Sequence, residues 1–174
     1  PAGTKGTHSG PAKSIDPVEA ESPAGLQIPD SFPEFVKKTS IPDSLSIDVN
    51  HVIYGDFNGD SKNDFAALVT NSKNGSQGVL VIHHSDKHEL FVFGAGREIN
   101  GMNNLEWIDI FETLPKGEVI APTSVDSETG DIIGPDKTKK FKLIGNGIYM
   151  HVDEACGGGI LYWTGDRYDW CHIE

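Results

Sequence analysis

The chain has few basic residues and no long apolar run. Its 174 residues include 14 lysines and arginines against 26 aspartates and glutamates, which gives a formal net charge of −12. A surface this acidic repels phosphate backbones, so we expect no nucleic-acid partner. No apolar stretch approaches the ~20 residues that a membrane-spanning helix needs, so we expect no transmembrane segment. The acidity suits divalent cations or a basic protein partner, and equally a surface that only keeps the protein soluble.

Cysteine is scarce as well. Cys156 and Cys171 are the two cysteines, and neither belongs to a C-x-x-C pair, which argues against zinc-ribbon and thioredoxin-type chemistry. We expect them to form one disulfide in an oxidising compartment, with two reduced thiols in a cytosolic protein as the alternative. A hairpin closed at residues 164–167 would place Ile160 opposite Cys171. The glycines at 157–159 would then let the chain fold Cys156 back toward its partner.

Large apolar side chains are nearly absent from residues 1–27. This stretch is rich in proline, glycine, alanine and serine, so it can bury too little surface to offset the entropy of ordering. We expect a flexible tether that spaces a domain from a membrane anchor or from another domain, with simple disorder as the alternative. Residues 28–174 are long enough to form a single domain with its own core.

The domain is expected to open with a short helix and to continue as β structure. Ser31 and Glu34 match a capping box, which predicts a helix that ends near Lys38. From Val49 onward, short strand-like runs alternate with turns rich in glycine, asparagine, aspartate and serine. The pattern predicts a mostly β fold, either an antiparallel meander or a sandwich, with α+β as the alternative.

The last third of the chain contains two expected hairpins. One joins residues 141–144 to 148–152 through Gly-Asn-Gly, and the other joins 160–163 to 168–172. Residues 123–138 are polar, and we expect them to form a long exposed loop.

An acidic loop of nine residues begins at Asp56. Asp56, Asn58, Asp60 and Asp64 occupy positions 1, 3, 5 and 9 of this loop, and Lys62 occupies position 7. Calcium takes six to eight oxygen ligands, which side-chain oxygens at alternate positions and the Lys62 carbonyl could supply. Three carboxylates this close in the chain repel one another unless a cation is present. We therefore predict a calcium site, with an Asx-rich turn that holds no ion as the alternative.

The loop and its flanks resemble the D-x-N-G-D-G-x-x-D signature of FG-GAP/VCBS-type blades, in which calcium bridges two strands. The resemblance covers about 15 of the 174 residues. The loop departs from the helix-flanked EF-hand, because positions 6 and 12 are Ser61 and Ala67 instead of glycine and glutamate. The FG-GAP/VCBS families build propellers from several copies of the motif. This chain has one copy, so we expect no propeller.

A single such loop behind a tether also resembles, more loosely, secreted lipoproteins of Gram-negative bacteria. That resemblance implies a periplasmic or cell-surface location.

Four aromatic residues lie on the final expected hairpin: Tyr162, Trp163, Tyr168 and Trp170. We expect Tyr162 and Trp170 to face away from Trp163, so that the aromatic side chains occupy both faces. One face would join the core, and the other would form a binding surface like those of lectins or protein interfaces. Core packing on both sides is the alternative.

Other patterns that carry chemistry are weak. His83, His84 and His88 are close in sequence, but a strand sends His83 and His84 to opposite faces, so we expect surface histidines at a turn and no zinc site. No P-loop, G-x-S-x-G or H-E-x-x-H motif is present, and no catalytic residue is predicted.

These patterns favour a non-enzymatic, calcium-stabilised, extracytoplasmic binding module. Its partner is expected to be a protein, which it could neutralise as an inhibitor or an immunity protein does. One alternative is a secreted hydrolase whose acidic catalytic residues are not identified. The other is a carbohydrate-binding module that uses calcium and the aromatic hairpin to bind a glycan.

Overall fold

The structure is a computed structural model that describes residues 29–154 and 157–173. The predicted tether, residues 1–27, lies outside the described residues. In chain order the described elements are α1 (Glu34–Lys38), β1 (Leu45–Gly55), β2 (Asp64–Asn71), β3 (Gln77–Ile82), β4 (Leu90–Gly94), β5 (Ile110–Leu114), β6 (Val119–Ile120), β7 (Thr123–Val125), β8 (Ile132–Pro135), β9 (Phe141–Lys142), β10 (Gly147–His151), β11 (Gly158–Trp163) and β12 (Tyr168–Ile173).

Two four-stranded antiparallel sheets form the body of the molecule. The first sheet has the order β1-β2-β3-β4, and the second has the order β12-β11-β10-β5. Both are meanders, but in the second a long excursion, residues 115–146, separates β5 from β10. The excursion contains two small ladders, β6 with β9 and β7 with β8. The predicted mostly β, antiparallel fold is confirmed, and the sheets are open, unlike the ring of a propeller.

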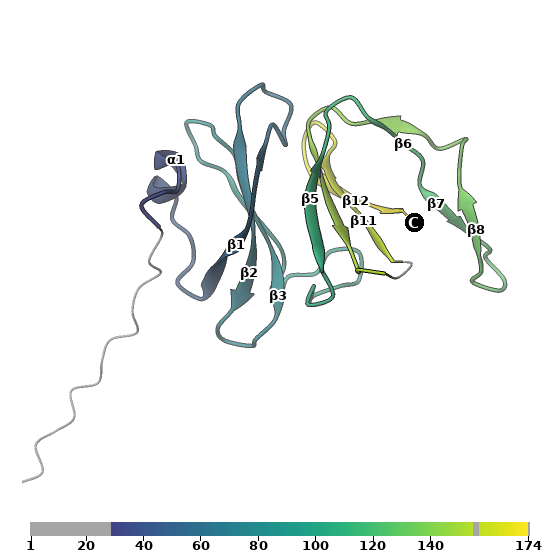
Figure 1. The fold of residues 1–174 in the computed structure, drawn as a ribbon, viewed down its shortest axis with the longest axis horizontal. Coiled ribbons are helices and arrows are strands. Elements are labelled where there is room, and N and C mark those ends of the chain that lie inside the picture. The colour runs from purple at the N-terminus through teal and green to yellow at the C-terminus, as the bar shows by residue number, and fades with distance from the viewer. Residues whose placement is uncertain (1–28, 155–156, 174) are drawn as a thin grey trace, which may run out of the picture.

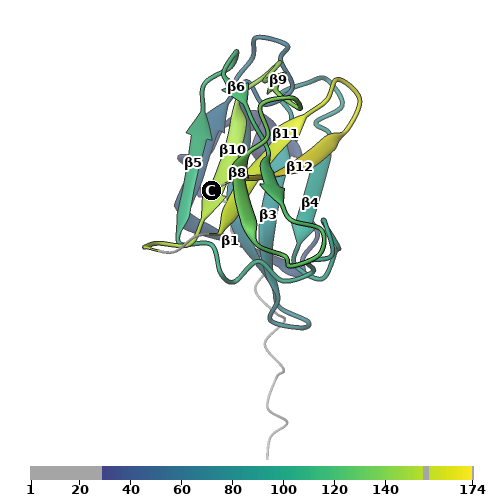
Figure 2. The same cartoon turned by 90° about the vertical axis from the view of Figure 1, so that its right-hand side faces the viewer.

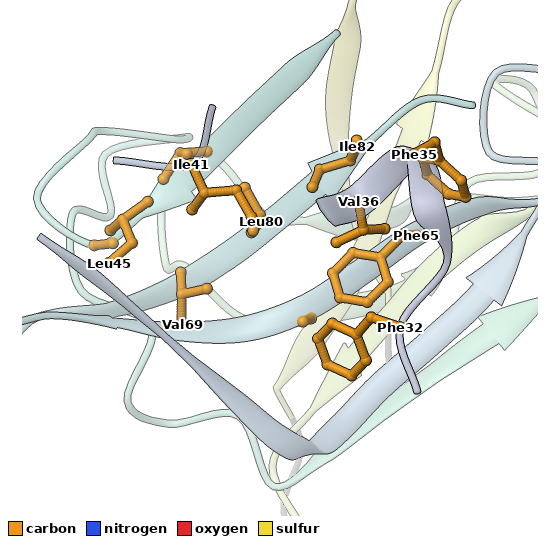
Figure 3. Close-up of a cluster of buried hydrophobic side chains, with 12 residues drawn as sticks. Phe32, Phe35, Val36, Ile41, Leu45, Phe65, Val69, Leu80 and Ile82 are labelled. Carbon is orange, nitrogen blue, oxygen red and sulfur yellow. The ribbon is translucent and has the colours of Figure 1, made fainter. Parts of the chain in front are cut away.

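The elements are stacked in four layers, as Figure 1 shows: α1, the first sheet, the second sheet and the excursion. Strand β2 lies in the middle of this stack, so both of its faces are buried. Phe65 and Val69 belong to the cluster under α1, where Figure 3 shows Phe65 beside Val36 and Phe32, whereas Ala66 packs toward the second sheet. Because both faces are covered, β2 reads in the sequence as a continuous apolar run instead of an alternating one.

The short helix is present, but its predicted capping box is wrong. The N-cap is Pro33, with φ −56°, and none of the described side chains caps the helix. Proline has the backbone angle of a helix start, so the helix begins at Glu34, and Ser31 stays in the preceding turn. The Glu34 carboxylate pairs instead with Lys37, at 3.2 Å. Among the described residues, no helix is long and apolar enough to span a membrane.

The excursion covers the outer face of the second sheet (Figure 2). The hairpin predicted between 141–144 and 148–152 is wrong, because β9 pairs with β6 whereas β10 lies between β5 and β11. Ile120 and Leu143 of the excursion pack against Ile160 and Cys171 of the sheet. Residues 123–138, expected to be a loop, contain the exposed β7–β8 hairpin.

Candidate functional site

The acidic loop, residues 56–64, lies where the first sheet meets the second. The backbone N–H of Asp56 donates to Asn146 Oδ1 at 2.9 Å, and the Asn146 N–H donates back to the Asp56 carbonyl at 2.6 Å. Asn146 also donates through Nδ2 to the Leu114 carbonyl at the end of β5, at 2.9 Å. One asparagine thus ties the start of the loop to the second sheet.

Glycines allow the two sheets to approach closely at this junction. Gly59 has φ +85°, and a Cβ there would lie 2.7 Å from the Ile144 carbonyl oxygen. A Cβ on Gly145 would lie 2.5 Å from the carbonyl oxygens of both Asp56 and Phe57. A side chain at either position would collide with backbone, which is much harder to move than a flexible side chain. The Gly-Asn-Gly segment that suggested a hairpin turn is therefore a docking surface for the acidic loop.

Asp64 is completely buried at the end of the loop. Its Oδ2 accepts from the N–H groups of Phe57 (2.9 Å) and Asn58 (3.3 Å), and its Oδ1 accepts from the N–H of His84 (2.8 Å). Burial raises the pKa of the Asp64 carboxyl, and these hydrogen bonds oppose that rise. The side chain predicted as a metal ligand thus has three backbone donors, and it holds the loop to the end of β3.

Asp56 has one oxygen in an ion pair and one without a partner. Lys116, from the excursion, places Nζ 2.7 Å from Asp56 Oδ2 and 3.1 Å from the Gly59 carbonyl. Asp56 Oδ1 is buried, and it has no hydrogen-bond partner in the described part of the chain. A buried carboxylate oxygen without a donor is unfavourable, so this atom is the best candidate in the loop for a bond to a cation.

The middle of the loop is open to solvent and folded by short-range bonds. The Asp60 N–H donates to Asn58 Oδ1 at 3.0 Å, and the Lys62 N–H donates to Asp60 Oδ1 at 2.9 Å. Ser61 has φ +70°. In EF-hand loops, glycine occupies the corresponding sixth position and makes a sharp turn. Ser61 therefore adopts a backbone conformation that favours glycine.

The oxygen donors of the loop suit calcium in kind. Asp56, Asn58 and Asp60 offer side-chain oxygens, and Lys62 offers a backbone carbonyl, all hard ligands of the type that calcium selects. Within 29–154 and 157–173, no three histidine, cysteine, aspartate or glutamate side chains converge in a metal-holding group. An ion here would therefore need Asn58 and the Lys62 carbonyl in addition to carboxylates. The sequence argument that three carboxylates require a cation is too strong, because Lys116 and backbone amides already serve two of them.

A buried histidine beside the loop was not identified from the sequence. His83 follows β3 and is 1% exposed, and its Nε2 lies 2.8 Å from the phenol oxygen of Tyr168 on the second sheet. Burial lowers the pKa of His83, although the nearby acids Asp64, Glu89 and Asp60 oppose this. His84 is exposed, and its ring stacks on Phe35 with centroids 4.4 Å apart. The expectation of a surface residue is therefore wrong for His83.

The aromatic hairpin has its predicted register, with Trp163 paired with Tyr168 and Ile160 paired with Cys171. Its aromatic side chains do lie on both faces, but the predicted division is wrong for Trp170. Trp170 pairs with Leu161 and so shares the inner face with Trp163, since residues 161 and 163 point the same way along a strand. Tyr162 is on the outer face, stacked on Phe141 at 4.4 Å.

Two adjoining cavities border strand β12. One has a volume of about 260 Å³ and the other of about 420 Å³, and both are lined by Asn100, Trp170 and His172. Trp107 lines the smaller cavity, edge-to-face with Trp170 at 6.3 Å between ring centroids, and Tyr162 lines the larger one. Of the four predicted aromatic residues, Tyr162 and Trp170 therefore reach a groove. Trp163 and Tyr168 pack around His83 instead.

Cys171 is buried on the outer face of the second sheet. Its thiol lies among apolar side chains of the excursion, and burial, together with Asp169, raises its pKa to about 11. Cys156 lies outside the described residues, so the disulfide stays a prediction.

A scan against protein-family models and searches of curated proteins and of solved structures give no match to this chain.

Proposed function

We propose that the protein is a non-enzymatic binding module whose two sheets are held together by calcium in the acidic loop. The observation that carries this proposal is the buried, unpartnered Asp56 Oδ1 at the junction of the sheets. A bound calcium ion would supply positive charge to this oxygen and to the other oxygen donors of the loop. Asp56, Asn58, Asp60 and the Lys62 carbonyl would hold it, while Asp64 orders the backbone around it.

Thermal unfolding in chelator and in millimolar calcium chloride tests this proposal. A ligand that binds only the native state raises the unfolding midpoint once its concentration exceeds Kd. We expect a higher midpoint in calcium for the wild type and no difference for Asp60→Ala, which removes one ligand. Asp43→Ala, which removes an exposed acid outside the loop, serves as the control and is expected to respond like the wild type. Equal midpoints for the wild type would contradict the proposal.

The partner we propose is a protein, bound through the β7–β8 hairpin. Val125, Ile132 and Ile133 are 47%, 52% and 66% exposed there, and Figure 1 shows this hairpin at the far side of the excursion from the sheets. Apolar side chains gathered on a projecting element are typical of interaction sites. Neutralisation of that partner, as by an inhibitor or an immunity protein, is the form of binding that we propose.

Capture of a partner from the source organism's envelope tests the role of the hairpin. The wild type is expected to retain one abundant protein, and the double variant Ile132→Ser, Ile133→Ser to lose it. Val49→Ser is the control, since Val49 is 53% exposed but lies on the first sheet. Equal capture by the wild type and the double variant would exclude the hairpin as the contact surface.

A glycan is the second candidate ligand, because the groove beside β12 combines aromatic with polar side chains. Trp107 and Trp170 offer ring surfaces for stacking, and Asn100 and His172 offer hydrogen-bonding groups. A glycan array would show binding by the wild type and loss of binding in Trp170→Ala. Tyr54→Ala, which removes a half-exposed aromatic ring on the first sheet, should leave that binding unchanged.

The location we propose is the periplasm or the cell surface. This rests on the lipoprotein resemblance and on the predicted disulfide between Cys156 and Cys171. Thiol titration of the denatured, unreduced protein should find no free thiol, and two free thiols per chain would contradict both. A secreted hydrolase stays the alternative for the same compartment, and turnover of a glycoside, ester or peptide substrate would favour it.

A further inference from the structure

Lys116, at the start of the excursion, brings a positive charge to the acidic loop. It follows β5 by two residues, and its Nζ lies 2.7 Å from Asp56 Oδ2 and 3.1 Å from the Gly59 carbonyl. The Asp56 side chain is 13% exposed, so the pair is shielded from water on the aspartate side. Its partners are 57 and 60 residues away in sequence. The ammonium is thus held between two groups of the loop.

The two oxygens of Asp56 differ in their partners. Oδ2 is bonded to the Lys116 ammonium, whereas Oδ1 is buried and has no partner among the described residues. Asp64 is already served by three backbone amides, and the Asp60 side chain is exposed to solvent. Asp56 is therefore the carboxylate at which the protein's own positive charge and a bound metal ion would meet.

We propose that Lys116 is a built-in counter-ion of the acidic loop that opposes calcium. The inference rests on the proposed calcium function and describes how that site is regulated. Without calcium, the ammonium neutralises Asp56 and keeps the loop docked on the second sheet. With calcium, two cations share one carboxylate and repel each other across a partly buried site, where water screens them less than in solution. Because coupling between two binding events is reciprocal, the ion pair weakens calcium binding as much as calcium weakens the ion pair.

This arrangement suits a module that meets calcium at high concentration. Calcium sites of extracellular modules have dissociation constants of about 10⁻⁴–10⁻³ M, weaker than those of intracellular sensors. A lysine that lowers the affinity of the loop would place it in that weak range. The same lysine would keep the empty loop folded when calcium falls.

Replacement of the ammonium by an uncharged side chain of similar length tests the inference. Lys116→Met keeps an unbranched stem, and the lysine side chain is 43% exposed, so the variant should fold. In chelator, we expect Lys116→Met to unfold at a lower temperature than the wild type. In a calcium titration, we expect a larger rise of its unfolding midpoint and a Kd about tenfold lower, because the repulsion is gone.

Two control variants separate the local ammonium from net charge and from packing. Lys73→Met makes the same change in net charge at the other end of β2, where Lys73 is exposed, and it should match the wild type in both conditions. Lys116→Arg keeps a positive charge near Asp56, and it should restore most of the wild-type calcium response. If Lys73→Met reproduces the Lys116→Met effect, net charge is the cause, and the inference is overturned.

The remaining outcomes separate this inference from the proposed function. If calcium stabilises the wild type but stabilises Lys116→Met equally or less, Lys116 does not oppose calcium, and the inference fails alone. An unchanged midpoint of Lys116→Met in chelator would also overturn it, because the empty loop would not depend on the ammonium. If calcium shifts neither protein, the proposed calcium site fails, and the inference fails with it.

Discussion

In each sheet the first two strands along the chain are neighbours, β1 and β2 in one and β5 and β10 in the other. The segments that connect these two pairs of strands differ in what they contact. In the first sheet, the acidic loop between β1 and β2 is bonded to the two ends of the excursion, through Lys116 beside β5 and Asn146 beside β10. In the second sheet, the excursion between β5 and β10 covers one face and then extends into the β7–β8 hairpin, where Ile132 and Ile133 are exposed. The acidic loop lies at the junction of the sheets, and the excursion leaves that junction and ends in an exposed apolar hairpin. The same strand topology therefore supports both a docked connection and one with an exposed apolar end.

Two aspartates, one in each connection, accept hydrogen bonds from backbone N–H groups, and their replacement tests the comparison. Asp64 accepts three backbone N–H groups in complete burial, whereas Asp126 accepts those of Glu128 and Thr129 on the exposed hairpin. Asp64→Ala leaves buried donors without acceptors, and we expect a loss of about 3 kcal/mol or more in the free energy of unfolding. Asp126→Ala exposes its donors to water and should have a much smaller effect. Urea denaturation measures both, and equal losses would remove the distinction between the two connections.

A pair of glycines with similar backbone angles sharpens the same contrast. Gly59 has φ +85° and Gly130, in the hairpin, has φ +77°, but only at Gly59 would a Cβ meet backbone, at 2.7 Å. Alanine is strained at both positions, and at Gly59 it must also push the sheets apart. We expect a loss of about 2–3 kcal/mol for Gly59→Ala and about 1 kcal/mol for Gly130→Ala, measured by the same method. Equal losses would mean that the junction yields easily.

The buried histidine predicts a pH dependence that arises at the junction. The pKa of His83 is lowered in the folded state, so between that value and about 6.5 the unfolded chain binds more protons. Stability should therefore rise with pH through this window, and it should fall by up to about 1.4 kcal/mol per pH unit on acidification below about 6.5.

His83→Gln keeps a polar partner for Tyr168 and should reduce this slope when both proteins are measured in chelator. His172→Gln, which replaces an exposed histidine beside the excursion, should keep the wild-type slope. A wild-type slope in His83→Gln would assign the pH dependence to other groups.

The smallest expected effect concerns the turn residue of each connection. In the hairpin, glycine occupies the positive-φ positions, Gly130 and Gly134, whereas the acidic loop has Ser61 at φ +70° in addition to Gly59. Ser61→Gly should remove the side-chain strain and raise the free energy of unfolding by about 0.5 kcal/mol, since the greater freedom of glycine in the unfolded chain offsets part of the gain. A decrease would indicate that the serine side chain stabilises the loop.

The sequence was a good guide to elements whose partners are close along the chain. The register of the last hairpin follows from a four-residue turn, and it correctly places Ile160 opposite Cys171. The turn at Gly145-Asn146-Gly147 misled, because its first two residues serve a long-range contact with Asp56 and Phe57. Glycine looks the same in a sequence whether it permits a turn or a close approach.

The acidic loop could be found from residue spacing, but its surroundings could not. Lys116 and Asn146 lie 60 and 90 residues from Asp56, and only the stacking of the two sheets brings them there. His83 reads as one of several polar residues at a turn, and it is buried because Tyr168 arrives from the opposite sheet. Such contacts leave no local periodicity in the sequence.

A crystal structure determined in calcium is the most direct test of the central claim that this loop binds calcium. The account predicts one ion in the acidic loop, about 2.3–2.6 Å from Asp56 Oδ1 and within the same range of oxygens from Asn58, Asp60 and Lys62. It also predicts that the Lys116 ammonium moves away from Asp56 Oδ2 or keeps a weaker contact with it. No ion at saturating calcium, with Lys116 still bonded to Asp56, would contradict the account.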